Sequence, residues 1–197
     1  LVTEKASERI ARAAFEYART HKRDRVTAVH KANVMRTSDG LFLDSVRKTA
    51  KNYPEIELDE VLVDAAAAHL VRNPGRFDVI VTTNMFGDIL SDLATELAGG
   101  LGLAASLNLG QKNAAAQAQH GSAPDISGQD QANPTSLIGS AAMLLDHLEL
   151  APAAQAIRQA LKVALTDPQS RTADLGGRLG TRAFTEIVVE LIRKATK

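Results

Sequence analysis

The stretch FDVIVTTNMFGDILSD, residues 77–92, decides the architecture because it joins a short apolar run to a helical pattern. The near-continuous apolar run at 77–83 is typical of a strand buried on both faces. A helix is predicted from about 87 to 98, and it would carry Asp88 and Asp92 on one face. Like charges four residues apart destabilise a helix by roughly 0.2–0.5 kcal/mol. The pattern therefore raises the question of what these two carboxylates face.

Helical and strand patterns alternate on the N-terminal side of this stretch. Thr3 is a plausible N-cap for the first predicted helix, and SDG at 38–40 is predicted to form a turn and a helix cap. Strands that alternate with helices indicate an α/β fold with parallel pairing. The predicted helices are 4–20, 41–52 and a short alanine-rich helix that stops at NPGR (73–76), and the predicted strands are 25–31 and 56–64.

The C-terminal half reads differently. Residues 110–133 are rich in Gly, Gln, Asn and Asp and show no clear periodicity, so they are predicted to form a loop. A loop of that length inside a compact protein is usually functional or disordered. Helices are predicted near 134–148, 151–165 and 183–195.

Composition excludes several classes of protein. Lys plus Arg and Asp plus Glu both number 23, so the net charge of zero argues against nucleic acid or an anionic membrane as the partner. The chain has no cysteine, no apolar run long enough to span a bilayer and no secretory leader, and we expect a cytoplasmic protein. Because it begins at Leu1 inside a helix approach, we expect it to be a piece of a longer chain.

Three aspartates follow or end predicted strands. Asp88 and Asp92 follow the apolar strand, and Asp64 ends the predicted strand at 56–64. Ligands gather at the carboxyl ends of strands in α/β sheets, and three carboxylates suit Mg²⁺ or Mn²⁺. The alternative is that Asp88 caps its helix and Asp92 is solvated.

Two further segments carry candidate chemistry. Lys31 follows an apolar strand, where it either transfers a proton or marks the strand's exit to solvent. The segment HGSAPDISGQDQANP (120–134) has small residues that let a ligand approach the backbone, or it is a simple connection. Asp125 within it could accept hydrogen bonds from ribose and would repel a 2′-phosphate, which favours NAD over NADP.

Long segments of the chain, in a consistent order, resemble the β-decarboxylating isocitrate and 3-isopropylmalate dehydrogenases. They are TEKASERIARAAFEYA, VHKANVMRTSDGLFLDS, NMFGDILSD, GGLGLA, HGSAPDISGQ, ANPTSLIGSAAMLL and DLGG. The resemblance implies a two-lobed α/β fold that is truncated on its N-terminal side. This fold is not a Rossmann fold, in agreement with the absence of GxGxxG. Residues 1–98 would form most of a small, dimerising metal-site domain, and 99–197 the C-terminal part of a large NAD-binding domain.

The resemblance also implies roles for single residues. Asp88 and Asp92 match two metal-binding aspartates of one subunit, whereas Asp64 and the catalytic Lys31 match residues delivered by the partner of a homodimer. Asn33 matches an asparagine near the substrate and nicotinamide. The residues that match the NAD-binding loop are His120, Gly121, Ser122, Ala123, Asp125, Ile126 and Asn133. Asp125 would contact the adenosine ribose and Asn133 would lie near adenine.

The implied reaction is metal-dependent oxidation of a 2-hydroxy acid by NAD, followed by loss of CO₂. HKANVM, SDGLF and VDAAA look more like NAD-isocitrate dehydrogenases than isopropylmalate enzymes. The family's substrate arginines and its proton-donating tyrosine would lie upstream, so neither Tyr17 nor Tyr53 is assigned that role. Gln117 stands where relatives often carry an acidic residue. The alternatives are a non-catalytic regulatory subunit, disfavoured by the retained Lys31 and aspartates, and an inactive fragment.

Overall fold

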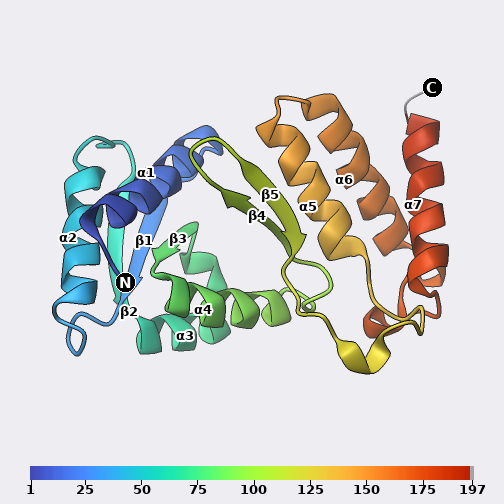
Figure 1. Cartoon of the computed structure of the whole chain (residues 1–197), viewed down its shortest axis with the longest axis horizontal. Coiled ribbons are helices and arrows are strands. Elements are labelled where there is room, and N and C mark those ends of the chain that lie inside the picture. Colours follow the sequence, from blue (N-terminus) through green and yellow to red (C-terminus); the bar gives the residue numbers. More distant parts are fainter. Residues whose placement is uncertain (196–197) are drawn as a thin grey trace. The chain divides into compact units, whose positions relative to one another are not determined.

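A computed structural model describes residues 1–195 of the 197 and divides them into two compact units, Leu1–Leu97 and the residues from Ala98 onward. The boundary follows helix α4 (Asn84–Leu97). The first unit contains a three-stranded parallel sheet, and the second contains an antiparallel hairpin and three long helices (Figure 1). The roles assigned above to two lobes remain predictions.

The sheet of the first unit has the strand order β2-β1-β3, formed by Glu57–Leu62, Arg25–His30 and Val79–Thr82. The central strand β1 is buried along almost its whole length. The edge strand β3 is covered on both faces, as predicted, because Val79 and Val81 pack into one core and Ile80 into the other. Val81 is buried, and the other three residues of the strand are half-buried. The segment 25–31, rich in β-branched residues, thus contains the central strand of the sheet, which pairs with β2 on one side and β3 on the other.

Helices cover both faces of this sheet. On one face α1 (Glu4–Thr20) and α2 (Ser38–Ala50) pack their apolar residues on Val26, Ala28 and Val81. On the other face α3 (Val63–Arg72) and α4 (Asn84–Leu97) enclose Val29 and Val61. Successive residues of β1 thus serve opposite cores, as the period of a strand requires. Phe15 and Phe42 are almost fully buried, and each such side chain contributes roughly 1.5–3 kcal/mol.

Several element boundaries differ from the sequence prediction. Thr3 does cap α1, since its hydroxyl accepts a hydrogen bond from the Ala6 N–H at 3.3 Å. The SDG segment is the first turn of α2 rather than a separate turn. Helix α4 begins at Asn84, three residues before the predicted start, so Asp88 lies inside the helix and does not cap it. Gly87 suggested a boundary that the helix passes through.

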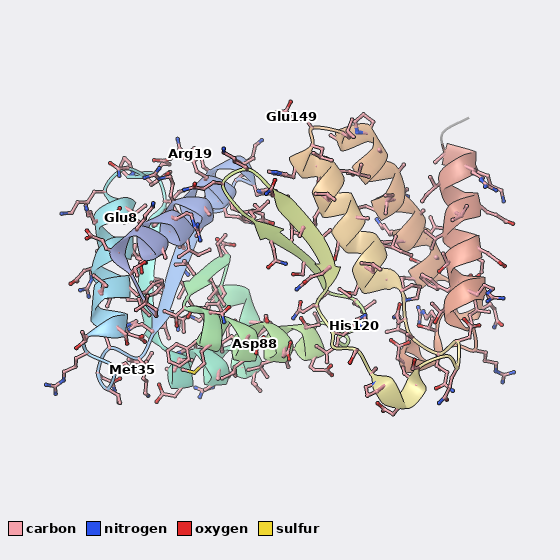
Figure 2. The ribbon with its side chains drawn as sticks, in the orientation of Figure 1. Glu8, Arg19, Met35, Asp88, His120 and Glu149 are labelled. Carbon is pink, nitrogen blue, oxygen red and sulfur yellow. The ribbon has the colours of Figure 1, made fainter. Side chains whose placement is uncertain are left out.

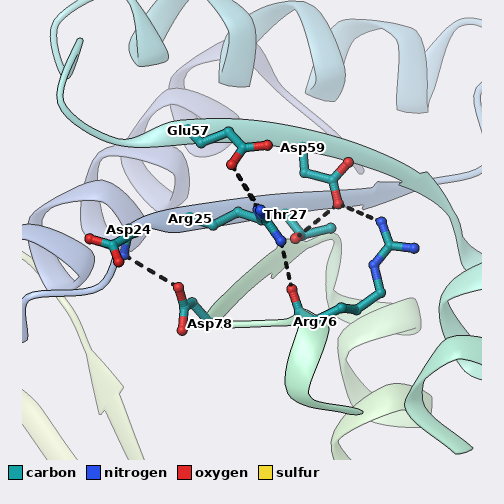
Figure 3. A network of polar contacts seen from close by, with 7 residues as sticks. All are labelled: Asp24, Arg25, Thr27, Glu57, Asp59, Arg76 and Asp78. Atoms are coloured by element: carbon teal, nitrogen blue, oxygen red, sulfur yellow. Dashed lines mark hydrogen bonds and ion pairs between the residues drawn. The ribbon is translucent and has the colours of Figure 1, made fainter. Parts of the chain in front are cut away.

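The amino edge of the sheet is closed by a network of ion pairs (Figure 3). Arg25 binds Glu57 on β2 at 2.9 Å and donates to the Arg76 carbonyl at 3.1 Å. Arg76 in turn pairs with Asp59 at 2.9 Å. These contacts tie the starts of β1 and β2 to the segment that precedes β3. The charges at this edge therefore have structural partners.

The second unit is built around helix α5. Strands β4 (Ala105–Leu109) and β5 (Ala114–Ala118) form a hairpin against α5 (Thr135–His147), followed by α6 (Ala151–Thr166) and α7 (Thr181–Ala195) (Figure 1). The prediction of an unbroken loop over 110–133 is wrong, because β5 lies within it. Its sequence AAAQA has no alternation of apolar and polar residues, so periodicity could not reveal the strand.

Short 3₁₀ segments complete the chain at Pro74–Arg76, Pro124–Ile126, Pro168–Ser170 and Ala173–Leu175. The core of the second unit joins α6 to α7 through Leu161, Ala164, Phe184 and Val188. Among the described helices, none combines the length and the hydropathy that crossing a membrane requires.

Candidate functional site

The candidate residues of the first unit follow the carboxyl ends of its three parallel strands. The register pairs His30 with Leu62, so the residues after β1 and β2 emerge side by side. Lys31 comes directly after β1. The sequence predicts that Asp64 ends a strand over 56–64, but β2 ends at Leu62 and Asp64 lies in the first turn of α3. Parallel strands present their carboxyl ends at one edge, where α/β proteins place ligands. The topology thus brings these residues together.

Lys31 and Asp64 form an ion pair with 2.9 Å between Nζ and Oδ2. The Lys31 side chain is 24% exposed and that of Asp64 is 66% exposed. The hydrogen bond from Lys31 lowers the pKa of the Asp64 carboxyl below its ordinary value, with smaller help from two backbone N–H groups. Asp64 is therefore held as a carboxylate, the form that binds a divalent cation.

Asp88 and Asp92 are both exposed on α4, one helical turn apart, and Figure 2 shows Asp88 on that helix. The predicted spacing on one face is confirmed, whereas the cap is excluded. Within residues 1–195, no three His, Cys, Asp or Glu side chains are grouped so as to hold a metal ion. The three aspartates therefore do not form a complete site within one copy of the described chain.

The backbone that carries Lys31 is held from both sides. The Lys31 N–H donates to Asp39 Oδ2 at 2.6 Å, and the Ala32 N–H donates to His30 Nδ1 at 3.1 Å. Asn33, the predicted substrate neighbour, is exposed on the turn that follows. Asp39 is not among the site residues predicted from the sequence, although it lies in the SDGLF segment on which the resemblance rests.

The second unit contains a pocket of about 680 Å³ along the loop that follows β5. Most of the predicted cofactor residues line it. Figure 2 labels His120, which lies in the loop after β5. Asp125 is not among the lining residues; it is exposed, and its carbonyl accepts a hydrogen bond from Gln129. The predicted residues that do line the pocket are His120, Gly121, Ser122, Ala123, Ile126 and Asn133.

Asn133 is the buried polar residue of the pocket wall, at 7% exposure. Its amide nitrogen donates to Asp174 Oδ2 at 2.9 Å, and its amide oxygen accepts the Thr135 N–H at 3.0 Å. These two contacts define the orientation of the amide. Asp174 belongs to the DLGG segment, which the sequence marked as part of the resemblance without giving it a role.

Small residues shape the rest of the pocket. Ala123 adopts a left-handed conformation with φ 42° directly before Pro124. Asp130 accepts the Arg182 N–H at 2.9 Å and so ties the pocket loop to the start of α7. No lysine or arginine is present among the lining residues of the described chain. The walls offer backbone groups, hydroxyls, the Asn133 amide, the His120 ring and the carboxylates of Asp130 and Asp174.

Comparisons with known proteins agree with one another. The model of the family described as isocitrate/isopropylmalate dehydrogenase matches residues 1–192. A mitochondrial NAD isocitrate dehydrogenase catalytic subunit of Arabidopsis thaliana is 48% identical over 96% of the chain and 51% of its own length. A 3-isopropylmalate dehydrogenase of Archaeoglobus fulgidus is 50% identical over 98% of the chain and 59% of its own length.

Solved structures give the same result. The crystal structure of isocitrate dehydrogenase from Methylococcus capsulatus matches with a TM-score of 0.95 at 49% identity, covering 98% of this chain and 57% of that one. The chain therefore spans somewhat more than half the length of the relatives that it matches.

Proposed function

Because the chain belongs to the isocitrate/isopropylmalate dehydrogenase family, we propose that the full-length protein oxidatively decarboxylates a 2-hydroxy acid with NAD as hydride acceptor. The observation that carries this proposal is the 2.9 Å pair of Lys31 and Asp64 at the carboxyl edge of the sheet. Isocitrate is the first candidate substrate, because the resemblance leans toward NAD-isocitrate dehydrogenases, and 3-isopropylmalate is the second.

Asp88 and Asp92 would hold a divalent cation together with Asp64 of a second copy. Their carboxylate oxygens suit Mg²⁺ or Mn²⁺, and the missing third ligand within one copy supports a homodimer with shared sites. Bound there, the cation would act as a Lewis acid on the substrate's hydroxyl oxygen. Lys31 would exchange a proton with that hydroxyl through Nζ, and Asp64 would keep Nζ in place.

The pocket of the second unit would bind NAD in preference to NADP. Its glycine-rich and alanine-rich loop exposes backbone groups to a ligand, and Asn133 offers an oriented amide. Asp130 and Asp174 line the same pocket, where carboxylates would repel a 2′-phosphate. Asp125 remains the predicted ribose contact, although in this structure it lies outside the lining residues.

The test is reduction of NAD⁺ by the full-length protein with Mn²⁺ and, in turn, isocitrate, 3-isopropylmalate, homoisocitrate, malate and tartrate. We expect turnover with one of the first two and about a 100-fold or greater loss of kcat in Lys31→Met. The matched control is Lys48→Met, since Lys48 pairs with Glu4 and Glu8 on the first helix. Absence of turnover from a folded protein with every substrate would favour a non-catalytic subunit.

A further inference from the structure

The carboxylate of Asp39 is buried but has no part in the proposed reaction. It is 1% exposed, and no ion pair links it to a lysine or arginine within residues 1–195. Its Oδ2 accepts the Lys31 N–H at 2.6 Å, and Ser38 Oγ lies 3.4 Å from Oδ1. Removing a carboxylate from water is costly unless its oxygens find donors. The burial therefore calls for a reason at this position.

The hydrogen bonds around Asp39 form a closed ring. The Met35 N–H donates to the Lys31 carbonyl at 2.8 Å, and the Asp39 N–H donates to the Met35 carbonyl at 3.0 Å. The Asp39 side chain then returns to the Lys31 N–H. All three links have ordinary or shorter hydrogen-bond lengths, so the turn between β1 and α2 is held at both ends. Asp39 is the one side chain in this ring.

The ring determines where the Lys31 side chain begins. Lys31 follows the last paired residue of β1, so the sheet ladder no longer restrains it. A lysine has four rotatable side-chain bonds, and its ion pair with exposed Asp64 restrains only the far end. An anchor on the backbone N–H fixes the near end, including the direction of the Cα–Cβ bond. Both ends of the side chain are then defined.

We propose that Asp39 is a positioning residue, which acts through the Lys31 backbone to hold the Lys31 ammonium at its working place. This inference rests on the proposed function, because it gives Lys31 the proton-transfer role. The Asp39 side chain hydrogen-bonds to the Lys31 N–H and to Ser38 Oγ, and Asp39 is not one of the residues that line the pocket. Its loss should therefore lower kcat and leave the KM values for substrate and NAD nearly unchanged. Misplacing a catalytic group by about 1 Å costs on the order of 100-fold in rate.

The experiment compares Asp39→Ser, Asp39→Asn and Asp44→Asn in the full-length enzyme. Serine suits the first turn of a helix but is too short to reach Lys31. Asparagine has the length of aspartate and keeps an oxygen that can accept the Lys31 N–H. Asp44 is an exposed carboxylate on the same helix that pairs with Arg47, so Asp44→Asn is the matched control. Steady-state kinetics and hydrogen exchange of the segment from Lys31 to Met35 are measured for each variant.

We expect Asp39→Ser to lower kcat about 10- to 100-fold with KM within about twofold of wild type. Its Lys31–Met35 segment should exchange about tenfold faster, while the Val26–Val29 segment of β1 is unchanged. Asp39→Asn should restore kcat to within about threefold, because the acceptor is retained. Asp44→Asn should match wild type in both measurements.

Three results would overturn the inference. They are an unchanged kcat in Asp39→Ser, a loss of kcat in Asp39→Ser without faster exchange of the Lys31–Met35 segment, and a loss in Asp39→Asn as large as that in Asp39→Ser. If Asp39→Ser fails to fold, Asp39→Asn decides alone, since a loss in kcat above about tenfold would contradict the role of a simple acceptor. If the wild type turns over no substrate, the proposed function fails, and the exchange data alone decide whether Asp39 anchors Lys31.

Discussion

Gly102 lies so close to Asn133 that its position has no room for a side chain. A Cβ built on Gly102 would meet Asn133 Cβ at 2.9 Å and its amide nitrogen at 3.0 Å. Both residues line the pocket of the second unit. The amide of Asn133 is also fixed by Asp174 and the Thr135 N–H, so it has little freedom to move away. The shape of the pocket therefore depends on one missing methyl group.

Gly102→Ala is expected to weaken NAD binding by about 1–3 kcal/mol, the usual cost of overpacking a fixed contact. Calorimetric titration of the full-length protein with NAD⁺ measures the change in Kd. Gly40→Ala is the matched control, because a Cβ at Gly40 meets nothing within 4 Å and alanine favours the helix that contains it. Equal affinities for the two variants would argue against NAD binding beside Gly102 and Asn133.

Asp88 and Asp92 illustrate which part of a local pattern survives folding. Their separation of four residues places them on one face of any helix that contains both, and α4 contains both. That helix begins at Asn84, two residues after the end of β3. The sequence around Gly87 did not reveal this early start. The cap was consequently the wrong alternative for Asp88, while the metal-binding alternative remains a prediction.

At the scale of elements, serine side chains of helix α5 hydrogen-bond to backbone groups of the β4–β5 hairpin and of the residue that follows it. Ser140 Oγ accepts the Ser106 N–H at 2.9 Å and donates to the Gln117 carbonyl at 2.7 Å. Ser136 Oγ likewise accepts the Gln119 N–H at 3.1 Å. Gly139 lies between them, so the helix can approach Ala105 closely. Two hydroxyls and a glycine thus attach the hairpin to the helix.

Ser140→Ala should lower the free energy of unfolding by about 1–3 kcal/mol, because it leaves the Ser106 N–H without its acceptor. Urea unfolding followed by circular dichroism measures the difference. Thr166→Ala removes a hydroxyl that donates to a carbonyl four residues earlier but is exposed, so it should cost less than about 0.5 kcal/mol. Similar losses in the two variants would argue against a special role for Ser140.

Helix α2 and strand β2 are joined by a pair of hydrogen bonds from Arg47 to Glu60, both 2.7 Å long. Hydrogen bonding to Arg47 is the largest cause that lowers the pKa of Glu60 below its ordinary value. A carboxyl whose pKa is lower in the folded state stabilises the protein above its unfolded pKa of about 4.3. That contribution is lost as the pH falls through the folded value.

Glu60→Gln should therefore lower the free energy of unfolding by about 0.5–1 kcal/mol at pH 7, and the difference should shrink once the pH falls below about 4. Urea unfolding at pH 7 and pH 3.5 provides the comparison. Glu55→Gln, which removes the weaker and more exposed pair with Arg19 at 3.6 Å, should change little at either pH. A constant deficit of Glu60→Gln at both values would contradict an electrostatic origin.

At the scale of the whole molecule, the amino and carboxyl ends of the parallel strands differ in which charged residues they carry and how these are paired. The amino edge pairs its arginines with Glu57 and Asp59 (Figure 3). At the carboxyl edge, Lys31 pairs with Asp64, while Asp88 and Asp92 are exposed on α4. A dimer with shared sites would place Lys31 and Asp64 of one copy against the α4 aspartates of the other.

Mixing two inactive full-length variants tests this sharing. The Lys31→Met and Asp92→Asn homodimers should each be inactive. A mixed dimer of the two variants would have one intact site, because both substitutions fall in its second site. Random exchange should restore about a quarter of the wild-type rate, since half of the dimers then have one of two sites. Mixing Asp88→Asn with Asp92→Asn should restore nothing. Equal recovery in both mixtures, or none in either, would refute shared sites.

The sequence by itself determined the family, the alternation of helices and strands, and the positions of Lys31 and Asp64 near strand ends. These follow from the order of residues, because propensity, periodicity and motif spacing are local properties. The tertiary structure decided the existence of β5, the edge position of β3, the ring through Asp39 and the wall formed by Gly102 and Asp174. Each of these depends on a contact between separate elements, which no local pattern of apolar and polar residues records.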